Sequence, residues 1–251
     1  LFGDADFRPD ELKIYPCSLI ESAELMQVYE RGDWRPYSED ELLEVLTDCM
    51  LQVPPYCRVT RVIRDISSDD IVVGNKRTNF RQIAEQEVDR RGGRLVEIRH
   101  REIRGESFDP ETLALRETVY RVGSGRECFL ELITPEDRIV GFVRLSLPKE
   151  PSFVPELGRH ALVRELHVYG GAVRLGHAPG GAAQHRGLGG RLLDAAADRA
   201  RGEGYSSLSV ISAIGTRDYY RNQGFEDGTL YQHRTLEPTR SLESSDRKSV
   251  V

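Results

Sequence analysis

The sequence predicts an α/β fold in which helices flank a mixed central sheet. Two apolar runs, residues 128–134 and 139–145, enclose the turn-forming residues 135–138, which is the pattern of a β-hairpin. A glycine-rich stretch, residues 170–183, then separates a β-branched run from an amphipathic helical pattern over residues 187–201. No apolar run approaches the length of a membrane-spanning helix, so we expect a soluble, cytoplasmic protein.

Composition allows one large domain or two small ones. The chain has 251 residues, of which 39% are apolar, enough for a buried core. It begins with Leu1, so we expect a fragment of a longer protein. Its four cysteines form no CxxC pair, which speaks against a zinc or iron–sulfur site. These residues are Cys17, Cys49, Cys57 and Cys128.

The first half of the chain alternates short strands and helices. Ser38 and Glu41 have the spacing of a capping box and predict the start of a helix. That helix places an apolar stripe on one face and ends before two prolines. The stripe consists of Leu42, Leu43, Leu46, Cys49 and Met50, and the other expected elements are strands at 12–16 and 58–66 and a helix at 81–91.

The second half contains the hairpin and the glycine-rich stretch. Its helix at 187–201 presents apolar residues at helical spacing, and Thr216 is expected to cap a short helix that ends at Asn222. Further strands are expected at 117–122, 161–169, 208–212 and 225–236. We therefore predict four segments: a folded unit over 1–92, a linker over 93–115, a second folded unit over 116–236 and a disordered tail over 237–251.

The motif with the clearest chemistry is a glycine-containing turn at the start of the 187–201 helix. Glycine lets the backbone approach a ligand, and the first amides of a helix favour a diphosphate. The turn has neither the Lys-Ser/Thr of a Walker loop nor the glycine spacing of a dinucleotide fingerprint. Taken alone, it is equally compatible with a tight connection. Its residues are Gln184, His185, Arg186, Gly187, Leu188, Gly189 and Gly190.

This turn resembles motif A of the GNAT acetyltransferases. The segment from Thr216 to Phe225, with its adjacent tyrosines and Gly-Phe, is similar to the last helix of that family. The resemblance implies a GNAT fold that binds acetyl-CoA. It also implies that the pantetheine arm pairs with the strand Glu165, Leu166, His167 and Val168.

A second resemblance extends over nearly the whole chain. The string Arg164-Glu165-Leu166-His167-Val168-Tyr169-Gly170 is similar to a signature of the Elongator catalytic subunit family. Strings at 12–16, 53–56, 61–66, 98–103 and 215–220 match that family in the same order. The resemblance implies the C-terminal end of a radical S-adenosylmethionine domain in front of the GNAT domain.

That family adds a carboxymethyl-type group, supplied by acetyl-CoA, to the wobble uridine of tRNA. Its [4Fe-4S] cluster and S-adenosylmethionine are expected only in a full-length protein, because the cluster ligands are not in this chain. Family members carry a cysteine just before the string at 98–103. Residues 92–97 contain none, so we expect no metal site.

Four residues are candidates for the catalytic chemistry, and each has a structural alternative. Glu165 is a possible general base through water, or one partner of an ion pair. His167, on the same face of the strand, is a second possible base or a packed ring. Of the neighbouring Tyr219 and Tyr220, one is expected to pack in the core. The resemblance favours Tyr220 as the cofactor contact and proton donor, and both tyrosines are counted with the acetyl-CoA site.

A basic stretch within residues 58–104 gives a candidate tRNA surface, although the net charge of −6 argues against a generally basic nucleic-acid binder. The expected RNA contacts are Arg58, Arg61, Arg64, Lys76, Arg77 and Arg81. The leading interpretation is acetyl-CoA-dependent tRNA modification, with accessory subunits or self-association as possible partners. A stand-alone N-acetyltransferase for protein lysine or small amines, and a non-catalytic module that binds acetyl-CoA or tRNA, remain open.

Overall fold

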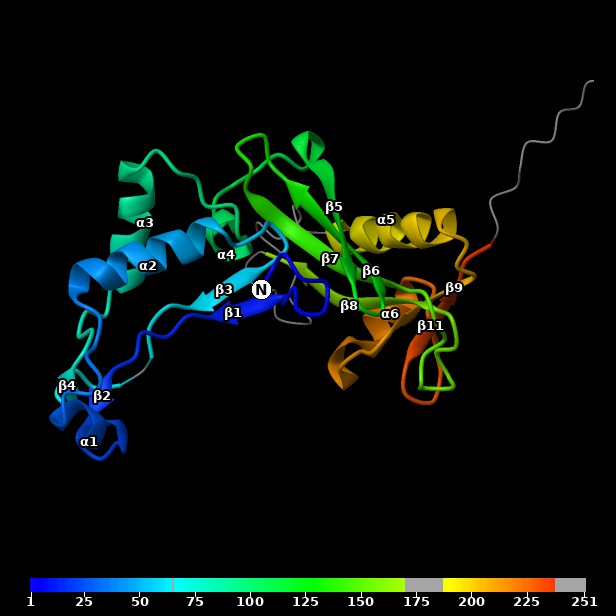
Figure 1. The fold of residues 1–251 in the computed structure, drawn as a ribbon. Coiled ribbons are helices and arrows are strands. Elements are labelled where there is room, and N and C mark those ends of the chain that lie inside the picture. The colour runs from blue at the N-terminus through cyan, green and yellow to red at the C-terminus, as the bar shows by residue number, and fades with distance from the viewer. Residues whose placement is uncertain (65, 170–186, 238–251) are drawn as a thin grey trace, which may run out of the picture. The chain divides into compact units, whose positions relative to one another are not determined.

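The computed structural model describes residues 1–64, 66–169 and 187–237 (Figure 1). The chain divides into two compact units, Leu1–Glu102 and Ile103–Val251. Each unit has its own sheet pairing and its own core, so each is described by itself.

The described residues of the first unit form two short strand pairs and four helices. Strand β1 (Glu11–Lys13) runs parallel to β3 (Arg58–Arg61), and β2 (Leu19–Ile20) runs antiparallel to β4 (Ile71–Val73). The helices are α1 (Leu25–Glu30), α2 (Glu39–Leu51), α3 (Phe80–Arg90) and α4 (Ile98–Arg101).

The start of α2 follows the predicted capping box. The Ser38 side chain accepts a hydrogen bond from the Glu41 amide at 3.2 Å, and the Glu41 carboxylate accepts one from the Ser38 amide at 2.8 Å. Leu46 and Met50 of the predicted stripe are buried. The strand expected at 58–66 is shorter in the structure, because β3 ends at Arg61.

A buried carboxylate organises the segment that we expected to be a linker. Glu97 is fully buried and caps α4 by accepting hydrogen bonds from the amides of Arg99 and His100, both at 2.9 Å. It also accepts the Val59 amide at 3.0 Å and the Arg81 guanidinium at 2.5 Å. Because these bonds join β3, α3 and α4, residues 95–102 belong to the folded first unit.

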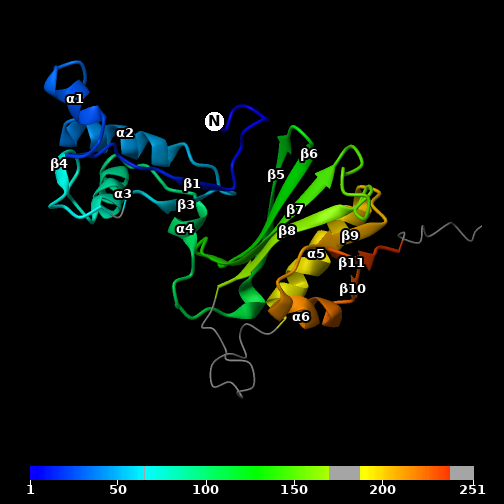
Figure 2. The ribbon, with the colours of Figure 1, turned by 90° about the horizontal axis from the view of Figure 1, so that it is seen from below.

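The second unit is built on a mixed sheet (Figures 1 and 2). Its described strands are β5 (Ala114–Val122), β6 (Gly125–Ile133), β7 (Ile139–Pro148), β8 (Ala161–Val168), β9 (Ser207–Val210), β10 (Glu226–Asp227) and β11 (Gln232–Thr235). They lie in the order β10-β11-β9-β8-β7-β6-β5, and among these pairs only β8 and β9 run parallel. The predicted hairpin is confirmed as β6 and β7.

Helix α5 (Leu188–Gly202) lies along one face of this sheet (Figure 2). Leu192, Leu193 and Ala196 are fully buried and form one core cluster with sheet residues such as Leu145 and Leu208. The amphipathic helix and the α/β fold with a mixed sheet are therefore confirmed. The remaining elements are the short 3-10 helices Pro110–Thr112 and Ile214–Thr216 and the helix α6 (Arg217–Asn222).

Two local predictions in the second unit are wrong. Thr216 precedes α6, but its hydroxyl donates to the carbonyl of Ala213 at 3.0 Å and caps nothing. Residues 225–236 do not form one strand, because the chain turns between β10 and β11, where the Gly228 amide donates to the Tyr231 carbonyl at 2.8 Å. Within the described ranges, no helix is long and apolar enough to span a bilayer.

A chain of hydrogen bonds through the buried Ser209 ties β9 and β11 to the loop before β8. The Ser209 hydroxyl, fully buried, lies 2.8 Å from Nδ1 of both His160 and His233. Nε2 of His233 lies 3.0 Å from the carboxylate of Glu156. Because the Ser209 hydroxyl has one proton, it donates to one imidazole and accepts from the other, so one of the two Nδ1 atoms must be an unprotonated acceptor.

Candidate acyl-CoA site

The sheet of the second unit opens between β8 and β9. The two strands pair only from Ala161 with Leu208 to Val163 with Val210, where β9 ends. β8 continues to Val168 and stays paired with β7 on its other side. Within the described residues, the edge of β8 over residues 164–168 therefore has no strand partner on the β9 side (Figure 2).

The start of α5 adjoins this part of β8. Gly187 has a φ of +89°, a conformation that favours glycine, and precedes the first helical residue, Leu188. A Cβ placed on Gly189 would lie 3.8 Å from the Leu166 side chain, so the first turn of α5 lies beside the middle of the open edge. The predicted residues Gln184, His185 and Arg186, and the glycine-rich stretch 170–183, lie outside the described residues.

The two tyrosines of α6 have different surroundings. Tyr220 is 8% exposed and packs edge-on against Phe225, so it is the core tyrosine. Tyr219 is 39% exposed, and its hydroxyl lies 2.2 Å from the position of a Cβ on Gly189. Burial, together with the nearby Tyr220 and Asp194, raises the pKa of Tyr219 to about 12. The hydroxyl beside the start of α5 is therefore that of Tyr219, and it stays protonated at neutral pH.

Glu165 lies in an ion pair. Its carboxylate accepts a hydrogen bond from Nε of Arg144 at 2.8 Å, across the β7–β8 pairing. Arg144 is 2% exposed, and its guanidinium lies 5.2 and 5.4 Å from the ring centres of Phe129 and Phe142. Glu165 therefore forms the structural ion pair that was the alternative to a general base. Its buried partner, Arg144, holds the carboxylate in one orientation.

His167 stacks on Phe142 with ring centres 5.6 Å apart and planes inclined by 12°, and it lies 4.4 Å from the ring of Tyr169. It shares a sheet face with Glu165, whereas Leu166 and Val168 pack against the core on the side of α5. Glu165 and His167 are therefore on the opposite face of β8 from Tyr219 and Gly189. The structure does not bring all the candidate catalytic groups together.

The predicted RNA-binding residues of the first unit fall into two groups. Arg81 donates to Glu85 at 2.8 Å and to buried Glu97, and Arg58 pairs with Glu102, so both are tied into the fold. The other four are exposed, and Arg77 pairs with Glu39 at 2.7 Å. They are Arg61, Arg64, Lys76 and Arg77.

Two important residues were not singled out from the sequence. Arg144 stands alone among apolar neighbours in the run 139–145, which is an unusual place for a charge. Glu97 had no comparable signal, because its partners Val59 and Arg81 come from distant parts of the chain.

Comparisons with known proteins show the family to which the chain belongs. Residues 94–225 match the acetyltransferase (GNAT) family, and residues 9–90 match the radical SAM C-terminal domain. The chain is 39% identical to a tRNA uridine(34) acetyltransferase of Dehalococcoides mccartyi, covering 90% of this chain and 50% of that protein. It is 36% identical to Elongator complex protein 3 of Danio rerio, covering 94% and 44% of the two chains.

A solved structure, that of Methanocaldococcus infernus Elp3 with an N-terminal deletion, matches with a TM-score of 0.83 and 34% identity over 94% of this chain and 57% of that one. The chain thus spans about half the length of the curated relatives it matches. The predicted resemblance to the Elongator catalytic subunit family is confirmed, and the chain belongs to the GNAT acetyltransferase family, with a radical SAM C-terminal domain in front of its acetyltransferase domain.

Proposed function

We propose that the second unit binds acetyl-CoA in the opening between β8 and β9, and that the chain serves in acetyl-CoA-dependent modification of the wobble uridine of tRNA. The open edge of β8 over residues 164–168 carries the first part. An extended ligand that contains amide groups, as the pantetheine arm does, adds to such an edge through main-chain hydrogen bonds. Glu165, Leu166, His167 and Val168 are the proposed contacts.

The diphosphate of the cofactor goes to the start of α5 in this proposal. Helix N-termini attract anions through free amides and the helix dipole. That turn is supplied by Gly187, Leu188, Gly189 and Gly190, and it lies beside the open edge of β8. Gln184, His185 and Arg186 complete the proposed loop.

For the chemistry we assign the proton donor to Tyr219 in place of Tyr220. Its protonated hydroxyl beside Gly189 suits donation to a leaving thiolate, whereas the ring of Tyr220 is part of the core. Glu165, oriented by Arg144, and His167 remain the proposed bases on the other face of β8.

The tRNA substrate and the wobble position are proposed from the names of the relatives, which are tRNA uridine(34) acetyltransferases and Elongator proteins. The exposed basic side chains of the first unit are the proposed phosphate contacts. The radical SAM match implies an iron–sulfur cluster and S-adenosylmethionine in longer proteins. The described residues hold no group of three metal-ligating side chains, so those residues do not fit the cluster.

The experiment offers the chain acetyl-CoA together with either tRNA or a lysine-containing peptide. Calorimetry measures cofactor binding, a gel-shift titration measures tRNA binding, and mass spectrometry of the peptide detects acetyl-lysine. The proposal expects cofactor binding, salt-sensitive tRNA binding and an unmodified peptide. Acetyl-lysine formed with multiple turnovers would instead favour the stand-alone N-acetyltransferase. Absence of tRNA binding at low salt would remove the proposed substrate.

A further inference from the structure

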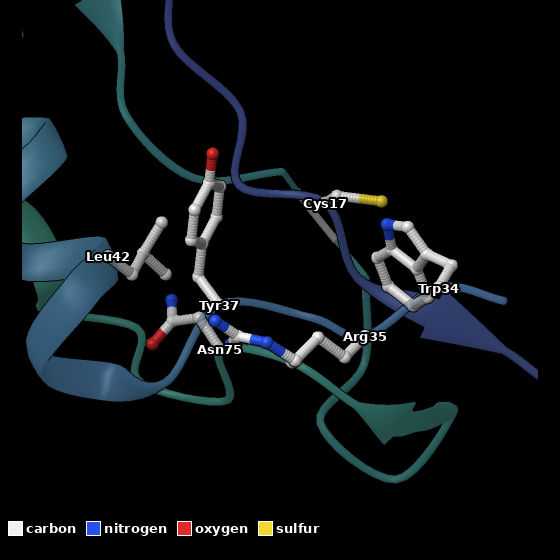
Figure 3. A pocket seen from close by; sticks show the side chains of 7 residues that line it. Cys17, Trp34, Arg35, Tyr37, Leu42 and Asn75 are labelled. Atoms are coloured by element: carbon white, nitrogen blue, oxygen red, sulfur yellow. The ribbon is translucent and has the colours of Figure 1, made fainter. Parts of the chain in front are cut away.

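The first unit contains a second candidate binding site, far in sequence from the acetyl-CoA elements. A pocket of about 280 Å³ is lined by Cys17, Trp34, Arg35, Tyr37, Leu42, Gly74 and Asn75 (Figure 3). Cys17 and Trp34 lie on one side of it, and Tyr37 and Leu42 lie on the other. Small-ligand pockets start at about 300 Å³, so this one suits a ligand no larger than a single nucleoside.

The two aromatic side chains keep their polar atoms available, and a neighbouring ring holds Trp34 in place. Trp34 packs edge-on against Tyr29 with ring centres 6.3 Å apart. Within the described residues, neither the Trp34 indole N–H nor the Tyr37 hydroxyl makes a hydrogen bond, and Tyr37 is 60% exposed. Flat aromatic surfaces with free polar tips are the features on which proteins stack single nucleobases.

The polar wall of the pocket is preset by local bonds. The Asn75 side chain accepts the Arg77 amide and donates to the Arg77 carbonyl, both at 3.1 Å. The Asn75 amide nitrogen keeps a second N–H that can donate, and its amide oxygen keeps a second lone pair that can accept. Together they match the hydrogen-bonding edge of a base. The Arg35 guanidinium is held flat by two bonds to Glu41, at 2.8 and 2.9 Å. A guanidinium in this state offers a stacking plane with its charge already balanced.

The neighbouring surface suits a phosphate. Asn75 also lines an adjoining depression together with Arg64, Lys76 and Arg77. Lys76 is exposed and has no ion-pair partner within the described residues. Arg64 lies over the Tyr15 ring at 6.0 Å, so its charge is not neutralised there. A base in the pocket would thus have two cationic side chains beside its sugar–phosphate link.

We infer that this pocket binds one unpaired nucleotide of the RNA substrate, with the base between Trp34 and Tyr37 and its phosphate at Lys76 and Arg64. The inference rests on the proposed function, because the RNA is the proposed tRNA. It gives the first unit a means of recognising single-stranded RNA, in addition to the attraction of phosphates to basic side chains.

The chain offers two built-in reporters for a test. Trp34 is the only tryptophan in the sequence, so its fluorescence reports on this pocket alone. Cys17 is exposed and lines the pocket, whereas Cys49 is exposed and does not. The probes are tRNA, a blunt RNA duplex of equal charge and the mononucleotide UMP. We expect tRNA to quench Trp34 and to slow alkylation of Cys17 several-fold, with Cys49 unchanged, and the duplex to do neither.

Variants separate this pocket from general RNA affinity. Tyr37→Ala should weaken tRNA binding by about 5- to 150-fold, the range that alanine substitution gives for the loss of one stacked base. Tyr37→Phe keeps the ring and should bind like the native chain, and so should Phe153→Ala, which removes a 97% exposed ring in the second unit. Circular dichroism checks that each variant is folded.

The outcomes distinguish the two claims. If tRNA binds but leaves Trp34 and Cys17 unaffected, the pocket assignment is wrong and the proposed function stands. If no tRNA binds, both fail. If UMP alone saturates the Trp34 response at the same concentration as tRNA, the pocket is a site for free nucleotides and the RNA assignment is overturned.

Discussion

Replacing Gly189 with alanine tests the contact at the start of α5 that positions Tyr219. A Cβ at residue 189 would lie 2.2 Å from the Tyr219 hydroxyl and 3.3 Å from Cζ of its ring. The hydroxyl must therefore retreat by about 1.2 Å to reach the 3.4 Å of an ordinary contact. A rigid tyrosine cannot do so by rotating its hydroxyl, so the ring or the helix must shift.

Two opposing effects set the magnitude. Overpacking of this kind costs about 1–3 kcal/mol, whereas alanine in place of glycine within a helix gains about 1 kcal/mol. Gly189→Ala alone should therefore destabilise the chain by up to about 2 kcal/mol. In a Tyr219→Phe background the closest atom is gone, and the same substitution should be neutral or stabilising by up to about 1 kcal/mol. The expected coupling between the two sites is about 1–3 kcal/mol.

The assay is urea unfolding of the native chain, Gly189→Ala, Tyr219→Phe and the double variant, followed by circular dichroism. Calorimetry with acetyl-CoA on the same four proteins is the functional readout. Gly189→Ala should weaken cofactor binding because it displaces the proposed proton donor and fills the proposed diphosphate turn. Equal effects of Gly189→Ala in both backgrounds would refute the contact, and unchanged cofactor affinity would move the site elsewhere.

Four further predictions follow from the described contacts. Ser209→Ala should cost about 2–4 kcal/mol in urea unfolding, because it removes two hydrogen bonds and leaves the nitrogens of two partly buried histidines unpaired. Stability should also fall as the pH drops below 6.5, because burial and the nearby His233 lower the pKa of His160 from that ordinary value. The unfolded chain then binds a proton at a higher pH than the folded chain does, so acid favours unfolding. A pH series of melting curves checks this, and a flat stability profile from pH 7 to 5 would contradict it. Replacing Arg61 and Arg64 with alanine should weaken tRNA binding and reduce the slope of log affinity against log salt by about 1–2. The affinity for acetyl-CoA should not change. If tRNA affinity does not depend on salt concentration, these side chains make no phosphate contacts. Incubating this chain with tRNA, acetyl-CoA and S-adenosylmethionine should yield no carboxymethyl-type uridine by mass spectrometry, because a radical enzyme needs a cluster and the described residues cannot hold one.

The local signals of the sequence were sufficient for the main elements. The hairpin of β6 and β7, the capping box of α2 and the amphipathic α5 each depend on neighbouring residues, and each is confirmed. The break between β10 and β11 was missed because its cause is remote. A Cβ on Gly228 would lie 2.2 Å from the Glu156 carboxylate, and that carboxylate also accepts the Leu230 amide at 2.9 Å.

The candidate site likewise contains features that the sequence could predict and features that it could not. The order of strand, glycine turn and helix could be predicted because it is a chain pattern. That one of Tyr219 and Tyr220 packs in the core could also be predicted, but which one could not, because that depends on their packing against Phe225 and Gly189. The pairing of Glu165 with Arg144 depends on the register between β7 and β8, which the sequence alone leaves open.

Hydrogen–deuterium exchange with and without saturating acetyl-CoA tests the central claim most directly. Among the described residues, the pairing of β8 with β9 stops at Val163, so a ligand that pairs with β8 over residues 164–168 should add protection to the amides on that side. We predict that acetyl-CoA slows exchange in peptides that cover this edge and the start of α5 at 187–191. Peptides of the first unit should be unchanged. Protection confined to other segments, or no protection at β8 under saturating cofactor, would contradict the account.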